Sequence, residues 1–151
     1  MRKLLSLFLI LIAAVTLFAQ ENPLWMRYTS ISPDGMTILF CYKGDLWSVP
    51  STGGKAVPLT LTESYEYAPV WSHDGKTIAF ASDRNGNFDV FVMAANGGEA
   101  KRLTFHSARE IPSNFTANNK DVIFSAYRQD LSAQAQFPVS MMGELYTVPV
   151  A

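Results

Sequence analysis

Two histidines and a single cysteine are the side chains of this sequence best suited to metal binding or nucleophilic chemistry. His73 and His106 lie far apart in the chain, and neither belongs to a zinc-binding spacing. Cys41 has no partner cysteine, which excludes a disulfide scaffold and a multi-cysteine zinc site within the chain. We expect His73 to be a turn residue, His106 to lie in a loop, and Cys41 to be a buried apolar residue of a strand.

Acidic and amide side chains alternate over one short stretch as they do at the start of a calcium-binding loop: Asp83, Asn85, Asn87 and Asp89. The glycine falls at position 86 rather than after the third ligand, and no glutamate closes the loop. A two-residue hairpin turn at Asn85-Gly86 explains the same residues. The sequence also lacks a Gly-x-Ser-x-Gly elbow, a His-Glu-x-x-His motif and a phosphate loop. It therefore predicts no catalytic, cofactor-binding or metal-binding residue in this segment.

The elements that position these residues form an internal repeat. An apolar stretch interrupted by a turn recurs at 31–40, 70–80 and 115–124, and its turn carries Asp34, Asp74 and Asn118, in steps of 40 and 44 residues. A second motif follows each time: Asp45-Leu46-Trp47, Asp89-Val90-Phe91 and Glu144-Leu145-Tyr146. A glycine pair and a Leu-Thr pair close the first two units: Gly53-Gly54 with Leu59-Thr60, and Gly97-Gly98 with Leu103-Thr104.

The residues of each unit favour four short antiparallel strands. Over 77–82 large and small side chains alternate, so that Ile78 and Phe80 would face one neighbour and Ala79 and Ala81 the other. Turn signals with a period in the forties are typical of β-propeller blades. We therefore predict an all-β fold, a partial β-propeller of about three blades over about 25–60, 66–104 and 110–151.

Two groups of repeated residues are interpreted as structural. Four aspartates at turns and strand starts are expected to make local hydrogen bonds: Asp34, Asp45, Asp74 and Asp89. Three aromatic residues are expected to form the core between blades rather than a ligand cage: Trp47, Trp71 and Phe91.

The third unit departs from the first two. Extra residues fall within 129–143, either as a functional loop or as a tolerated surface insertion. The third unit also lacks the glycine pair before Ala151. Because propellers usually close with four to eight blades, we expect a truncated N-terminal piece of a longer protein. Assembly with other chains is the alternative.

The first residues resemble an export signal. Arg2 and Lys3 precede an apolar run over 4–18, and Ala19 precedes polar residues. This pattern predicts a signal peptide over 1–19, with the incomplete propeller over 20–151 and no membrane span after cleavage. An uncleaved membrane anchor is the alternative, although the run is short for a bilayer. We expect an exported protein, periplasmic or extracellular.

Charge and composition limit the function classes. With 12 basic and 13 acidic residues the chain carries a formal net charge of −1, and a nucleic-acid binder would usually be basic. The aromatic content of 13% argues against disorder. On its residues alone, the segment is a scaffold or binding surface.

The repeats resemble those of TolB and of tricorn proteases. The resemblance lies in Ile31-Ser32-Pro33-Asp34-Gly35, in Val70-Trp71-Ser72-His73-Asp74-Gly75, in 78–84 and in the glycine pairs. The stretches 42–50, 84–90 and the insertion from Arg128 are more similar to a secreted tricorn-like protease. TolB carries an α/β domain before its propeller, and these repeats begin too early for one. His73 departs from the proline usual at its place.

The resemblance implies a propeller that guides or filters peptide substrates toward a serine peptidase domain absent from this segment. Its partners would be peptides, further blades and that catalytic domain, with no nucleic acid and no cofactor. Two alternatives remain: a non-enzymatic, TolB-like periplasmic propeller that binds proteins, and the propeller of a prolyl-oligopeptidase-like enzyme. Whether the chain belongs to an enzyme is left open, because no catalytic residue can be assigned here.

Overall fold

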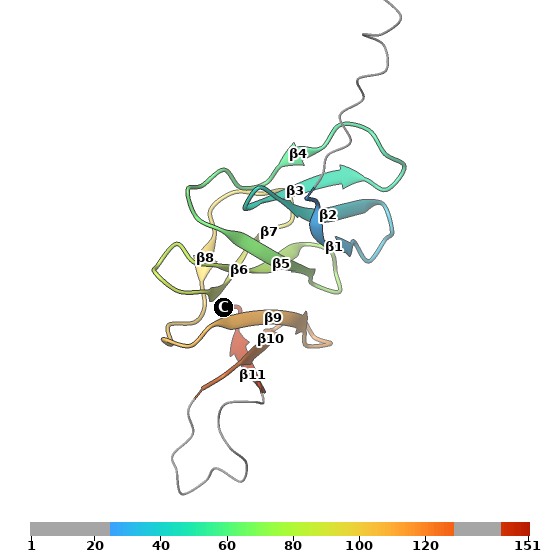
Figure 1. The fold of residues 1–151 in the computed structure, drawn as a ribbon. Helices are drawn as coiled ribbons and strands as arrows, with labels where there is room; N and C mark the ends of the chain where they lie inside the picture. Colours follow the sequence, from blue (N-terminus) through green and yellow to red (C-terminus); the bar gives the residue numbers. More distant parts are fainter. Residues whose placement is uncertain (1–24, 129–142) are drawn as a thin grey trace, which may run out of the picture.

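The computed structural model describes residues 25–128 and 143–151, and all regular structure in these residues is β (Figure 1). The proposed signal peptide and nearly all of the 129–143 insertion lie outside the described residues. The strands are β1 (Arg27–Ile31), β2 (Thr37–Tyr42), β3 (Asp45–Pro50), β4 (Val57–Pro58), β5 (Glu66–Trp71), β6 (Thr77–Ser82), β7 (Asp89–Ala94), β8 (Lys101–Arg102), β9 (Glu110–Phe115), β10 (Asp121–Ala126) and β11 (Glu144–Pro149).

The strands form three antiparallel sheets, each following chain order. The first sheet is β1-β2-β3-β4, the second is β5-β6-β7-β8, and the third joins β9, β10 and β11. The central pairs are regular: β2 and β3 pair from Thr37↔Pro50 to Tyr42↔Asp45, and β6 and β7 repeat that register. The predicted all-β class and the antiparallel four-stranded unit are confirmed.

The first strand of each sheet lies along a common inner edge. Strand β5 contacts β1 on one side and β9 on the other, so β1, β5 and β9 follow one another in space (Figure 1). Each of these strands has a register shift against its neighbour. At this shift Tyr28 and Ala68 take positive φ values of 54° and 53°, which is the geometry of a bulge that bends a strand.

Two apolar cores hold the sheets face to face. Between the first and second sheets lie Leu39, Cys41, Leu46, Tyr67, Ile78, Phe80, Ala81, Phe91 and Met93. Between the second and third lie Ala79, Val90, Val92, Leu103, Phe115, Val122, Phe124 and Ala126. Alternation along β6 therefore sends Ile78 and Phe80 to one core and Ala79 to the other, as predicted, whereas Ala81 joins the first core.

The three aromatic residues expected in the core have different outcomes. Phe91 is buried in the first core, and Trp71 packs against it and donates its Nε1 proton to the Ser30 carbonyl at 3.3 Å. Trp47 does not belong to either core. It is half-buried and packs edge-on against Tyr42, with 6.1 Å between ring centroids. Residues alternate in side along β3, and Leu46 occupies the side that faces the second sheet.

The turns between the first two strands of each unit are closed by a side chain, as predicted for Asp34 and Asp74. Asp34 Oδ1 accepts hydrogen bonds from the Ser32 hydroxyl at 2.6 Å and from the Met36 N–H at 3.0 Å. Asp74 repeats these bonds with Ser72 and Lys76. The serine hydroxyl and then the backbone N–H keep the pKa of each carboxyl below its usual value. Positive φ values follow at Gly35, Gly75 and Asn119.

The connections between the second and third strands differ in length. In the first sheet Lys43-Gly44 makes a two-residue hairpin with φ values of 54° and 92°. The two-residue turn predicted at Asn85-Gly86 is wrong, because residues 83–88 all lie between β6 and β7. The turn is instead closed by the Gly86 N–H on the Asp83 carbonyl at 2.8 Å.

Polar contacts at the turns tie the second sheet to the third. The His73 N–H donates to Asn119 Oδ1 at 2.7 Å, and His73 Nε2 lies 3.1 Å from the Phe115 carbonyl oxygen. A carbonyl only accepts, so His73 Nε2 carries the proton. The turn residue predicted at His73 therefore also joins two sheets.

Asn119→Ala is expected to lower the free energy of unfolding by about 1–2 kcal/mol. Asn119 has a φ of 58° and accepts the His73 N–H; alanine tolerates this backbone poorly and has no acceptor. Aspartate at position 119 also has a side-chain acceptor and tolerates positive φ. The free energy of unfolding of Asn119→Asp should therefore stay within about 0.5 kcal/mol of the wild type. Urea unfolding of the three proteins checks this, and equal loss in both variants would contradict it.

Candidate functional site

One face of the molecule collects the loops that vary between units. In the described residues this loop face consists of the β2–β3 and β6–β7 connections, at 43–44 and 83–88, and of the connectors between sheets, at 59–65 and 103–109 (left side of Figure 1). Thr60 and Thr104 hold the two connectors alike, because their hydroxyls accept the N–H of Leu46 and of Val90 at 2.9 and 2.8 Å. The opposite face carries the turns at 32–36, 72–76 and 116–120.

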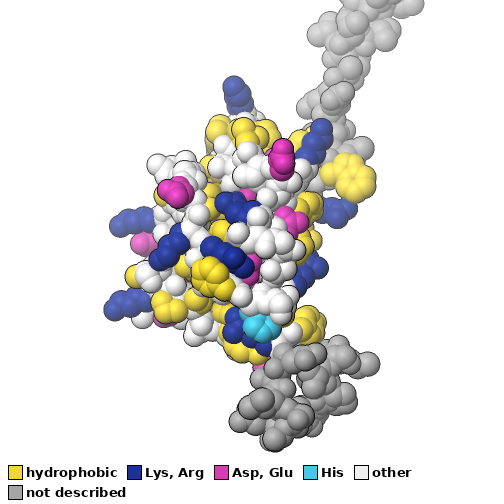
Figure 2. Space-filling model, turned by 90° about the vertical axis from the view of Figure 1, so that its left-hand side faces the viewer, with side chains coloured by type: hydrophobic (Ala, Val, Ile, Leu, Met, Phe, Trp, Pro, Cys, Tyr) yellow, Lys and Arg dark blue, Asp and Glu magenta, His cyan; other side chains and the backbone are white. Residues whose placement is uncertain are grey.

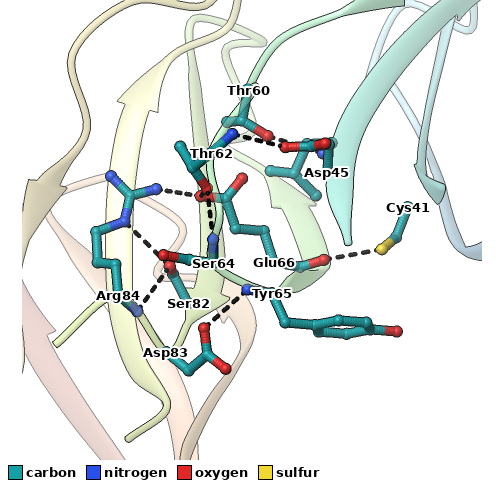
Figure 3. Close-up of polar contacts among 11 residues, drawn as sticks. Cys41, Asp45, Thr60, Thr62, Ser64, Tyr65, Glu66, Ser82, Asp83 and Arg84 are labelled. Atoms are coloured by element: carbon teal, nitrogen blue, oxygen red, sulfur yellow. Dashed lines mark hydrogen bonds and ion pairs between the residues drawn. The ribbon is translucent and has the colours of Figure 1, made fainter. Parts of the chain in front are cut away.

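Each connector ends in a buried glutamate that pairs with an arginine. Glu66 is fully buried at the start of β5, and its Oε1 binds Arg84 and the Thr62 hydroxyl (Figure 3). Glu110 is fully buried at the start of β9 and accepts from Arg128 Nε at 3.0 Å. The sequence analysis missed these pairs, although glutamate and arginine each recur after 44 residues, at 66 and 110 and at 84 and 128.

A third ion pair corrects the interpretation of Asp89. The expectation was a local hydrogen bond at the edge of a strand, but Asp89 is fully buried and its Oδ2 lies 2.7 Å from Arg102 on β8. Burial raises the pKa of the Asp89 carboxyl, while the positive charge of Arg102 opposes this shift and the negative charge of Glu110 adds to it. Asp45, which starts β3 in the first sheet, does accept a hydrogen bond, from the Thr62 N–H at 3.0 Å.

An aromatic cluster occupies the loop face where the inner strands begin. We call it the axial cluster, and it consists of Tyr28, Tyr65, Tyr67, Phe88 and Arg109. Tyr67 is its buried centre, with Tyr28 at 5.2 Å and Phe88 at 4.9 Å between ring centroids. Arg109 covers both inner rings, at 5.0 Å from the Tyr67 centroid and 4.9 Å from that of Phe88. Its Nε also donates to the Tyr67 hydroxyl at 2.7 Å.

The axial cluster offers rings and a positive charge to solvent. Tyr28 and Tyr65 are 45% and 41% exposed, and Arg109 is exposed as well. No carboxylate forms an ion pair with Arg109 among residues 25–128 and 143–151. Burial raises the pKa of Tyr67 and of Tyr65, so both phenols are neutral at pH 7. Figure 2 views the loop face and shows Lys and Arg side chains next to hydrophobic ones. Such a surface suits apolar and anionic groups.

The residues singled out for nucleophilic or metal chemistry are not brought together. His106 Nδ1 accepts the Ala108 N–H at 3.0 Å, and Cys41 is buried and donates to the Glu66 carbonyl at 2.8 Å. Within the described part of the chain, no serine, threonine or cysteine side chain hydrogen-bonds to a histidine ring, and no cluster of three potential metal ligands occurs. Of the suspected calcium ligands, Asp83 accepts the Tyr65 N–H, and Asn87 donates to the carbonyls of the 103–109 connector.

A hollow on the opposite face is a weaker candidate. It measures about 720 Å³ and lies between the first two sheets, with Trp71, His73, Asp34 and Asp74 in its lining. Its ionisable groups are already used, since both aspartates close their own turns and His73 binds the third sheet. The loop face therefore remains the better candidate for recognition.

Successive antiparallel sheets packed face to face, with the first strand of each along a common inner edge, define part of a β-propeller. The sequence matches the tricorn protease N-terminal beta propeller domain family over residues 23–150. This chain belongs to that family.

Individual relatives agree with this assignment. Tricorn protease homolog 1 of Streptomyces coelicolor is 32% identical over 108 residues, which cover 71% of this chain and 10% of that protein. The crystal structure of the tricorn protease superposes with a TM-score of 0.64 at 14% identity, over 86% of this chain and 14% of the other. A putative TolB from Agrobacterium tumefaciens gives a TM-score of 0.64 at 25% identity, over 74% of this chain and 42% of the other.

The match covers only a small part of the longer relatives, because the chain spans about a tenth of the Streptomyces protein. Within the described residues no helix is long and apolar enough to cross a membrane. The family match thus assigns this chain to an N-terminal propeller domain.

Proposed function

We propose that this chain is the N-terminal propeller segment of an exported serine peptidase and that its loop face directs peptide substrates toward a catalytic domain elsewhere in the protein. The observation that carries the proposal is the family match over residues 23–150, joined to an exposed cluster of tyrosines and arginine at the inner strands. Rings hold apolar side chains of a peptide, and a guanidinium without a carboxylate partner attracts its anionic groups. Export is proposed from the pattern of residues 1–19.

Arg109→Ser is expected to lower kcat/KM of the full-length protein for long, unfolded polypeptides by about 3–10-fold, the equivalent of about 0.7–1.4 kcal/mol. Cleavage of a short fluorogenic peptide should not change, because a guiding surface acts before the substrate reaches the catalytic domain. Lys76→Ser, an exposed lysine in the 72–76 turn on the opposite face, is the matched control and should affect neither substrate. Unchanged cleavage of long polypeptides by Arg109→Ser would contradict the guiding role.

A TolB-like, non-enzymatic propeller that binds proteins is the second candidate. It is favoured by the superposition on the Agrobacterium TolB, which equals that on the tricorn protease in TM-score. Labelling of the full-length protein with a fluorophosphonate separates the two, because this reagent modifies activated serine nucleophiles. Specific labelling supports the peptidase, and absence of labelling in correctly folded protein supports the TolB-like alternative.

A further inference from the structure

A pocket of about 440 Å³ opens beside the axial cluster, where β1 begins and the β2–β3 hairpin turns. This size lies within the range of ligand sites, which is roughly 300–1,000 Å³. Its lining consists of Trp25, Arg27, Cys41, Lys43, Gly44 and Tyr65. Tyr65 is shared with the axial cluster, so the pocket continues the surface to which we assign peptide recognition.

The charged residues that the structure places on the pocket walls are positive. Arg27 and Lys43 line the pocket, and no acidic residue of 25–128 or 143–151 does. Their cationic groups lie over rings, at 5.1 Å from the Trp25 centroid and 5.4 Å from the Tyr42 centroid. Neither forms an ion pair with a carboxylate in the described residues. Two uncompensated cations beside apolar walls favour an anion that carries an apolar group.

The acidic residues nearest the pocket are engaged elsewhere. Glu66 binds Arg84 and the Thr62 hydroxyl, and Figure 3 shows this network above the Tyr65 side chain. Asp83 Oδ1 accepts the Tyr65 N–H at 2.7 Å. Asp45 accepts the Thr62 N–H. In the described part of the chain these three carboxylates therefore have other partners, and none of them pairs with Arg27 or Lys43.

The floor of the pocket is apolar and unreactive. Gly44 has a φ of 92°, and a Cβ added there would lie 3.4 Å from the Tyr65 ring, so glycine permits this close approach. The Cys41 thiol donates to the Glu66 carbonyl. Burial raises its pKa, which keeps it protonated at neutral pH. The pocket therefore has the character of a binding site, with charge at its rim and apolar surface below.

We propose that this pocket binds a carboxylate next to an apolar side chain of a peptide. The carboxylate lies between Arg27 and Lys43, and the apolar side chain packs against Trp25 and Tyr65. The proposal rests on the proposed function in so far as the ligand is a peptide. Its carboxylate comes either from an internal acidic residue or from the end of the chain, since both present the same group.

Binding of three labelled peptides to the full-length protein, followed by fluorescence anisotropy, tests the pocket. The first has an internal Phe-Glu and an amidated end, the second has Phe-Gln in its place, and the third is neutral inside with a free carboxylate after phenylalanine. We expect the first or the third peptide to bind at least fivefold more tightly than the second. Tighter binding of the first identifies an internal acidic residue as the source of the carboxylate, and tighter binding of the third identifies the end of the chain. Equal binding of all three overturns the proposal.

Variants locate the site. Arg27→Gln and Lys43→Asn are each expected to weaken binding of the carboxylate peptide about 5–10-fold, which corresponds to about 1–1.4 kcal/mol. Asparagine is chosen at position 43 because it tolerates the φ of 54° found there. Lys55→Gln, which removes an exposed lysine from the 51–56 turn of the same sheet, should have no effect. Unchanged affinity in both pocket variants overturns the proposal.

Trp25 gives a second measurement. It lines the pocket and is 70% exposed, so a bound carboxylate peptide should shield its fluorescence from quenching by acrylamide, and Trp25→Phe should abolish that protection. Unchanged quenching with saturating peptide contradicts the location. The two proposals can fail separately. If peptide binding depends on Arg27 and Lys43 but fluorophosphonate does not label the protein, the pocket is supported and the peptidase is refuted. If fluorophosphonate labels the protein but the peptides do not bind in this way, the peptidase is supported and the pocket is refuted.

Discussion

Arg84→Met is expected to lower the free energy of unfolding by about 3 kcal/mol. Glu66 is fully buried, and the guanidinium of Arg84 is its charged partner (Figure 3). Removal of one member of such a pair leaves an uncompensated charge in the interior, which costs about 3–5 kcal/mol. The lower end applies because a quarter of the Arg84 side chain is exposed and water can reach the vacated space. Urea unfolding followed by tryptophan fluorescence measures the loss, since Trp47 and Trp71 lie in strands of the first two sheets.

The control for this prediction is Arg109→Met. Arg109 also stacks on two rings, as Arg84 does on Phe80 and Phe91, but it has no carboxylate partner in the described residues. Its loss should cost no more than about 1 kcal/mol. The double variant Glu66→Gln with Arg84→Met should recover part of the stability, because the buried charge is then gone. Equal losses in Arg84→Met and Arg109→Met would show that ring stacking, rather than charge, stabilises this position.

The parts of the fold that could be predicted from the sequence are those fixed by local chemistry. Asp34 and Asp74 close turns with their own neighbours, and the alternation along 77–82 separates Phe80 from Ala79 between the two cores. Each of these outcomes depends on a few adjacent residues. The four-strand unit recurs along the sequence with a period in the forties. This recurrence was enough to predict a propeller.

The errors arose where distant residues compete for the same groups. Asn85-Gly86 has the sequence of a two-residue hairpin, but Asp83 binds the Tyr65 N–H and Arg84 binds Glu66. These contacts to the preceding connector remove residues 83–88 from the strand pairing. Asp89 likewise pairs with Arg102 on another strand, which its neighbours in sequence do not indicate.

The candidate site was missed for a related reason. Tyr67, Phe88 and Arg109 come from a strand, a loop and a connector, and they meet only because the inner strands begin side by side. One sequence signal was available, since Tyr65 and Arg109 occupy the same place 44 residues apart, one before each buried glutamate. A change from tyrosine to arginine at a repeated exposed position indicates recognition rather than packing.

Phe80→Ala is expected to lower the free energy of unfolding by about 3–5 kcal/mol. Phe80 has no exposed surface and lies at the centre of the core between the first two sheets. It stacks on Phe91 with 6.0 Å between ring centroids, and Arg84 covers it at 5.7 Å. Truncation removes the apolar surface of the ring and leaves a cavity between two sheets that β-pairing keeps from collapsing. The change is measured by the same urea unfolding.

Two variants show whether the loss comes from the cavity. Phe80→Leu keeps most of the volume and should cost less than about 1.5 kcal/mol. Phe105→Ala removes the same ring from a residue that is 73% exposed and also covered by an arginine, Arg102 at 4.6 Å, so it should cost about 0.5 kcal/mol. A loss below 1.5 kcal/mol in Phe80→Ala would mean that the sheets close the cavity. The interface between blades would then be more adaptable than its complete burial of Phe80 implies.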